Sequence, residues 1–165
     1  MSMDMFLIFN ADSNIKGESR DAEHGKSFAI DVLAWSWGMS QSGTTHTGSG
    51  SGAGKVSVQD LNVTKYIDKS SPAIMLCCSN GKHITDATLI VRKAGETPVE
   101  YLKIKMTDLI VTSLSTGGSG GEDRLTENIS LNFAEVAVDY IEQKADGSPG
   151  DKPSYKWKIA ENIKG

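Results

Sequence analysis

Two long segments of this chain alternate apolar and polar residues, and each changes phase once along its length. In the segment 99–115, Leu102, Ile104 and Met106 alternate at even positions, whereas Leu109 and Val111 alternate at odd positions. The second segment, 124–143, changes in the opposite sense, from Ile129, Leu131 and Phe133 at odd positions to Val136, Val138 and Tyr140 at even positions. Alternation with a period of two indicates a strand with one buried face, and a β-bulge changes its phase. Two long bent strands with matched phase changes predict a closed or strongly curved antiparallel β-barrel.

The remaining strand signals are shorter and make the chain mainly β. Strands are predicted over 28–37, 55–67, 84–93 and 155–159, with turns at 93–96 and 146–150. The 28–37 run carries apolar residues on both faces, because Trp35 has the opposite parity to Val32. Two interpretations stay open for this run: a core strand covered on both sides, or a surface that contacts another protein chain.

One short α-helix is predicted at about residues 72–80. Pro72 suits the first helical turn, and Ser70 or Ser71 can accept an N–H hydrogen bond as the N-cap. Gly81 follows as a left-handed stop. The helix would brace the sheet from one side.

Cysteine usage points to reduced thiols. Cys77 and Cys78 are neighbours in the sequence, and a disulfide between neighbours strains the backbone. At helical spacing they share one broad side with Ile74, so both are expected to pack against the sheet.

Composition bounds the class of protein. The chain has 165 residues, which predicts one domain over 1–165, and its 38% hydrophobic and 23% charged residues are ordinary for a globular fold. A net charge of −4 argues against nucleic-acid binding. The N-terminal run has no positively charged segment, and no stretch of about 18 apolar residues occurs, so neither a signal peptide nor membrane insertion is expected. The chain is therefore expected in the cytoplasm after synthesis.

The residues that usually carry chemistry are not arranged for it. Three Gly-Lys pairs lack the glycine that a phosphate-binding loop needs five residues earlier. Asp21, Glu23 and His24 lack a partner pair for a metal and are interpreted as a solvated acidic turn before a strand. No nucleophile elbow occurs. The sequence therefore predicts no catalytic, cofactor-binding or metal-binding residue and a protein that is not an enzyme.

Glycine is concentrated in two places. Ten of the 17 glycines lie between Gly38 and Gly54 or between Gly117 and Gly121. The tract 41–54 consists mainly of Gly, Ser and Thr without periodicity, which indicates a long exposed loop between strands.

Several ordered blocks resemble the haemolysin-coregulated protein (Hcp) family of type VI secretion. The blocks are Gly17–His24, Ile30–Gly38, Lys65–Pro72, Gly81–Ile84 and Gly120–Phe133. Together they cover essentially the whole chain in order. The resemblance implies a β-barrel with a short flanking helix and no cofactor.

The resemblance also implies a structural role. Family members form six-subunit rings that stack into the inner tube of a contractile injection machine, with a spike protein at the tip and a sheath around the tube. They leave the cell through that machine, which suits a secreted protein without a signal peptide. Some hold effector proteins in the ring lumen, and others carry a fused toxin domain. This chain is expected to be an unfused, structural member, and the alternative is a stand-alone effector-binding chaperone.

Under this resemblance the glycine-rich loops become candidate contacts between stacked rings, since glycine lets backbones approach closely. The candidates are Ser42, Gly43, Thr44, Gly48, Gly50, Gly52, Gly54, Gly117, Gly118, Gly120 and Gly121. Loops that are merely flexible are the alternative. If Trp35 and Trp37 are buried in the barrel, alternation turns Ser36 outward, which makes Ser36 the candidate lumen residue.

Overall fold

The computed structural model describes residues 3–43, 54–93 and 98–165 and consists of strands with one α-helix and two 3₁₀ turns. The strands are β1 (Met3–Phe9), β2 (Ile30–Ser36), β3 (Met39–Ser40), β4 (Ser57–Val58), β5 (Leu61–Tyr66), β6 (Ile84–Lys93), β7 (Val99–Gly117), β8 (Thr126–Tyr140), β9 (Ser154–Lys158) and β10 (Ile163–Lys164). The helices are η1 (Ala11–Ser13), η2 (His24–Ser27) and α1 (Ser71–Asn80). No helix in this described part of the chain has the length and apolar character needed to cross a membrane.

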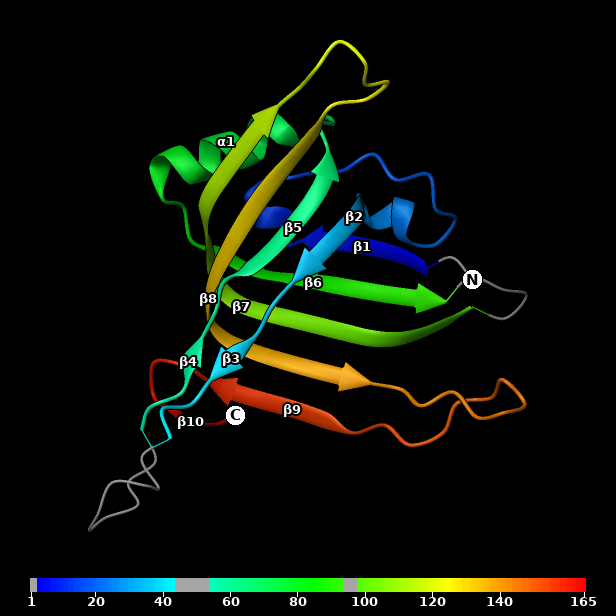
Figure 1. The fold of residues 1–165 in the computed structure, drawn as a ribbon, viewed down its shortest axis with the longest axis vertical. Coiled ribbons are helices and arrows are strands. Elements are labelled where there is room, and N and C mark those ends of the chain that lie inside the picture. The colour runs from blue at the N-terminus through cyan, green and yellow to red at the C-terminus, as the bar shows by residue number, and fades with distance from the viewer. Residues whose placement is uncertain (1–2, 44–53, 94–97) are drawn as a thin grey trace.

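Six strands close into an antiparallel barrel. The order β8–β5–β2–β1–β6–β7 returns to β8 through the β7–β8 pairing, while β9 and β10 extend the sheet beyond β8. Figure 1 shows the long β7–β8 hairpin crossing the whole barrel, with α1 packed on one side of it. The predicted fold class, a mainly β barrel with one short helix, is confirmed.

The phase changes in β7 and β8 lie opposite one another, as predicted. Met106 pairs with Val136 and Leu109 pairs with Phe133, so the burial pattern of both strands shifts between these two pairs. Asp108 has a φ of 51°, which marks the bend in β7. Here β8 also changes its outer neighbour, since its residues 126–131 pair with β5 and its residues 135–139 pair with β9. One edge of β8 thus pairs with two different strands of the same sheet.

Helix α1 begins one residue earlier than predicted, and its serines do not cap it. Ser70 is the N-cap residue, but its side chain makes no capping hydrogen bond and instead donates to Asp68. The left-handed stop at Gly81 is confirmed by a φ of 64°. Ile74 and Cys77 are buried against the barrel, so the packing side of the helix was predicted correctly, and both cysteines are free.

Three strand predictions need correction. The run 55–67 was predicted as one strand, but it is divided between β4 and β5, which belong to different sheets. The run 28–37 was expected to carry apolar residues on both faces. A bulge after Val32 returns Trp35 to the inner side, so Val32 and Trp35 both pack toward the core. Strand β1 was not predicted, since its apolar run does not alternate.

Candidate functional site

Small, uncharged side chains predominate on the outer side of the upper barrel wall. Strands β2, β5, β8 and β7 lie side by side there, in that order. We call ten of their outward side chains the neutral face, because none carries a charge: Ala34, Ser36, Asn62, Thr64, Asn128, Ser130, Asn132, Thr112, Ser113 and Ser115. Asp31 and Leu33 of β2 and Ile110 of β7 border these residues on the same side of the wall.

Four side chains of the neutral face form hydrogen bonds with one another. Thr64 donates to Asn128 Oδ1 at 2.6 Å, and Ser130 donates to Asn62 Oδ1 at 2.6 Å, in each case across the β5–β8 ladder. Such cross-strand pairs stabilise the sheet and fix the side-chain rotamers. Hydrogen-bonding capacity that is used within the face is not available to a visiting molecule.

A single carboxylate marks the lower border of the neutral face. Asp60 accepts hydrogen bonds from Asn132 Nδ2 at 2.8 Å and from Thr112 Oγ1 at 2.7 Å. Both oxygens of this carboxylate are therefore occupied, and Asp60 is held by two members of the face.

Behind the neutral face lies a buried ionic cluster. Lys65 and Glu127 are cross-strand neighbours in β5 and β8, both are 0% exposed, and Lys65 Nζ bonds to Glu127 Oε1. Lys65 Nζ also lies 3.1 Å from Asp68 Oδ1, and Ser71 of α1 donates to Glu127 at 2.7 Å. Burial of a charge costs free energy unless it is paired and hydrogen-bonded. The cluster joins both central strands of the wall to the start of α1.

Ser36 lies on the neutral face, on the side that alternation predicted. It pairs with Asn62, and its side chain is exposed, whereas Trp35 packs against the core. The lumen role assigned to Ser36 remains a prediction.

The two glycine clusters lie at opposite ends of the molecule. The longest axis is vertical in Figure 1, with the β7–β8 turn at the top and the β3–β4 ribbon at the bottom. Gly117, Gly118, Gly120 and Gly121 belong to the top end, whereas Ser42, Gly43 and Gly54 belong to the bottom end. The candidates Thr44, Gly48, Gly50 and Gly52 lie outside the described residues.

Nothing within the chain requires glycine at several of these positions. A Cβ atom at Gly43, Gly117, Gly120 or Gly121 would meet no heavy atom within 4 Å. Among the described glycines only Gly81 and Gly147 have a positive φ, so the end glycines adopt backbone conformations open to other residues. Gly118 differs, because its Cβ would lie 2.3 Å from the Leu125 side chain.

Separate from the neutral face, a strap formed by residues 17–29 covers the outer side of β1 and β6. Arg92 Nη2 of β6 lies 2.6 Å from Asp21 Oδ1 of the strap and 3.1 Å from Asp4 Oδ2 of β1. The hydrogen bond from Arg92, followed by that from the His24 backbone N–H, holds the pKa of Asp21 well below its usual range. The same ion pair raises the pKa of Arg92.

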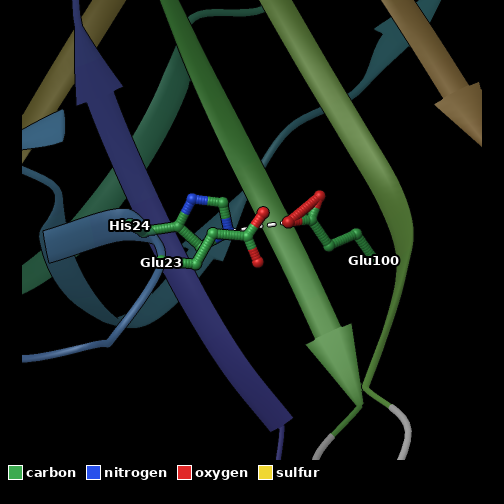
Figure 2. Close-up of side chains that lie close together, drawn as sticks. All are labelled: Glu23, His24 and Glu100. Atoms are coloured by element: carbon green, nitrogen blue, oxygen red, sulfur yellow. Dashed lines mark hydrogen bonds and ion pairs between the residues drawn. The ribbon is translucent and has the colours of Figure 1, made fainter. Parts of the chain in front are cut away.

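Figure 2 shows the strap residues Glu23 and His24 converging with Glu100 of β7. Their ligand atoms lie within 4.8 Å of one another, which makes them the one group of metal-capable side chains in the described segments. His24 Nε2 bonds to Glu100 Oε1 at 2.7 Å, and Lys103 Nζ lies 3.2 Å from Glu100 Oε2. Burial raises the pKa of Glu100, but the hydrogen bonds from Lys103 and His24 lower it overall. The direct hydrogen bond between His24 and Glu100 and the nearby Lys103 ammonium group hold these side chains together. We therefore interpret the cluster as a structural ion-pair group.

The interpretation of this region as a solvated acidic turn was wrong for two of its three residues. His24 is 7% exposed and stacks on Phe6 with ring centroids 4.9 Å apart, and Asp21 is paired with Arg92. Only Glu23 is exposed. The partners Arg92 and Glu100 are about 70 residues away in sequence, so local spacing could not have identified them.

A closed six-stranded antiparallel barrel with one short flanking helix defines a mainly β class of protein. The chain belongs to the Hcp family of type VI secretion proteins. The family model "Type VI secretion system effector, Hcp" matches residues 6–140. Protein hcp1 of Pseudomonas aeruginosa is 60% identical over 165 residues, covering 99% of both chains.

Solved structures agree with this assignment. Hcp1 of Salmonella typhimurium superposes with a TM-score of 0.80 at 39% identity, covering 99% of each chain. A type VI secretion system effector from Yersinia pestis gives a TM-score of 0.75 at 36% identity, covering 94% of this chain and all of that one. The protein is therefore a secreted protein of the type VI secretion class with a β-barrel fold.

Proposed function

We propose that this protein is a structural subunit of the type VI secretion inner tube, which assembles as a hexameric ring with the neutral face toward the lumen. The observation that carries the proposal is the neutral face itself: ten small or polar uncharged side chains on four adjacent strands, four of which are hydrogen-bonded to one another. A wall of this kind gives little adhesion to material that passes along it. Family membership supports the same role.

Ring formation is tested by size. We expect the purified protein to elute in gel filtration at several times its 17.7 kDa and to form rings in negative-stain images. A strictly monomeric protein at micromolar concentration and above would contradict the proposal and would favour a stand-alone chaperone module. Co-purification of effector proteins with a monomer would be the mark of that alternative.

The rings are proposed to stack head to tail through their two glycine-bearing ends. The ends lie at opposite extremes of the long axis. Four of their glycines, Gly43, Gly117, Gly120 and Gly121, are explained neither by backbone conformation nor by packing against the described residues, whereas Gly54 and Gly118 are closely packed within the chain. If the backbone of the next ring approaches these positions closely, that contact explains why glycine occupies them.

The stacking proposal predicts that substitutions at a glycine-bearing end impair stacking and secretion but leave folding and ring formation unchanged. In the double variant Gly120→Gln/Gly121→Gln we expect unchanged folding and normal rings, because both positions are open within the chain. We expect shorter stacks in negative-stain images and secretion reduced several-fold. Ser154→Gln, at an exposed position on β9, is the matched control. Full-length stacks and normal secretion of the double variant would refute the assignment of this end, and deletion of residues 49–52 applies the same test to the other loop.

The remaining partners follow from the tube role. Ser36 is the proposed lumen residue that faces effector proteins, and the spike and sheath of the secretion machine are the proposed neighbours of the tube. The protein is proposed to work as one domain without enzymatic activity or cofactor. It would reside in the cytoplasm until it is exported through the machine.

A further inference from the structure

We infer that neighbouring copies of this chain meet through two particular surfaces: the exposed apolar side of α1 in one copy packs against the strap of the next copy, around Phe28. This inference rests on the proposed function, since it assumes a ring whose lumen is lined by the neutral face. It names the surface that each copy presents to each of its two neighbours.

Helix α1 is apolar on its exposed side as well as on its buried side. The run Ala73–Cys78 is continuously apolar, and the helix carries no charged residue. Ile74 and Cys77 are buried against the barrel, whereas Met75 is 40% exposed and Leu76 is 62% exposed. A helix that is apolar all round is normally covered on both sides. The exposed side of α1 therefore has the character of a surface that another protein covers.

A second exposed apolar side chain, Phe28, lies in the strap directly before β2. Its side chain belongs to a residue that is 46% exposed, and its backbone φ is 57°, a left-handed conformation that is unusual for a bulky residue. Phe28 ends η2, a position at which glycine or asparagine is usual. An exposed aromatic residue kept in a strained conformation points to a role outside the packing of the single chain.

The two surfaces lie at opposite lateral edges of the upper barrel wall. Strand β7 pairs with β6 only up to Leu109, so its upper part forms one edge, and α1 packs against this strand. Strand β2 forms the other edge beside the strap, because only Ile30 and Asp31 of β2 pair with β1. Figure 1 shows α1 on the left of this wall and the strap, in blue, on the right, at a similar height along the long axis. When the neutral faces of all copies are turned toward one lumen, α1 of one copy faces the strap of the next.

The charges at the two surfaces fit together. Helix α1 begins on the strap side, where the Lys69 backbone N–H donates to Glu18 of the strap, and it runs from there toward β7. Its last turn contains no basic residue, and the ammonium group of Lys82, which follows the helix, donates to the Asp12 carbonyl oxygen. The partial negative charge at the C-terminal end of α1 therefore suits a cationic partner surface.

The strap of the next copy offers such cations. Lys16 Nζ and Lys69 Nζ lie 4.9 Å and 5.7 Å from the centroid of the Phe28 ring. An apolar side chain between two ammonium groups complements an apolar helix that ends in partial negative charge. The contact is heterologous, because each copy contributes a different surface to each neighbour, and a heterologous contact repeated by rotation closes into a ring.

The test measures the concentration at which rings dissociate, by analytical ultracentrifugation over a dilution series. Leu76→Lys removes an apolar contact and places a cation opposite Lys16 of the next copy. Phe28→Asn removes the aromatic ring with a residue that suits the left-handed backbone, so we expect it to fold normally. Ile163→Lys is the matched control, since Ile163 is 49% exposed on β10, in the lower half of the molecule (Figure 1).

We expect Leu76→Lys and Phe28→Asn each to raise the dissociation concentration at least tenfold, while circular dichroism shows a folded chain and Ile163→Lys leaves the value unchanged. In the double variant Leu76→Lys/Lys16→Glu we expect at least a threefold recovery, because the new charges attract each other across the contact. Wild-type stability of the rings in either single variant, an equal loss with Ile163→Lys, or no recovery in the double variant would overturn the inference.

The same experiment separates this inference from the ring proposal. A wild-type protein that is monomeric at every concentration refutes the ring and the contact together, whereas wild-type rings that tolerate both substitutions refute the contact alone. If Leu76→Lys does not fold, Leu76→Ser takes its place beside Phe28→Asn, with the same expected direction.

Discussion

Replacement of Lys65 by methionine is expected to lower the free energy of unfolding by roughly 3–5 kcal/mol. Lys65 is 0% exposed, and its ammonium group is the shared partner of Glu127 and Asp68. Methionine fills a similar volume but leaves Glu127 buried without a counter-charge, which is the costly way to break a buried ion pair. Urea unfolding followed by circular dichroism measures the effect.

The double variant Lys65→Met/Glu127→Leu separates charge from packing. Because it removes both members of the buried pair, we expect it to recover most of the lost stability. If the double variant is as unstable as Lys65→Met, packing or the hydrogen bond to Ser71 contributes more to stability than the pairing of charges. If Lys65→Met is as stable as wild type, the buried cluster does not stabilise the fold. Lys105→Met, at an exposed position of β7, is the control and should change the stability little.

Loss of the Asp21–Arg92 pair is the second large effect, and it should depend on pH. Asp21→Asn is expected to cost about 2–3 kcal/mol at pH 7, in the range for hydrogen bonds to charged groups. In the folded protein the pKa of Asp21 lies below the value of 3.8 taken for the free group. The ionised form therefore adds stability that is fully present above about pH 4 and is lost as the pH falls further.

The measurement compares wild type and Asp21→Asn in urea at pH 7 and at pH 3. We expect the stability difference between them to shrink at pH 3, because Asp21 is then largely protonated in the unfolded wild-type chain and must release that proton on folding. Asp139→Asn, at an exposed position of β8, controls for the loss of a charge alone. If wild type and Asp21→Asn differ in their free energy of unfolding by the same amount at both pH values, the Asp21–Arg92 ion pair is not what holds the strap against β1 and β6.

Local patterns predicted the strands and the bend but not the pairs between strands. The phase changes in β7 and β8 were visible because buried apolar residues report which side of a strand faces the core. The strap remained hidden because Asp21 meets Arg92 only after folding. The buried cluster did leave a trace: Lys65 follows the parity of Leu61 and Val63, and Glu127 follows that of Ile129. Opposite charges at inward positions of two strands are a usable sign of a buried pair.

The neutral face shows a different limit of sequence reasoning. Alternation placed Ser36 outward, but it could not reveal which strands lie beside β2. The run 28–37 was interpreted as apolar on both faces because Val32 and Trp35 have opposite parity. The bulge after Val32 explains this error, since one unpaired residue moves every later side chain to the other side.

The shared strand β8 also determines how the molecule bears load. The upper halves of β7, β8 and β5 run along the long axis from the top end toward the middle of the molecule (Figure 1). Their ladder hydrogen bonds lie across that direction. A push along the axis therefore acts on the ladder in shear, so that many hydrogen bonds resist it together instead of opening one after another. Because the lower half of β8 pairs with β9, this one strand joins the two halves of the molecule, and a force on the upper half is transmitted along it to the lower half.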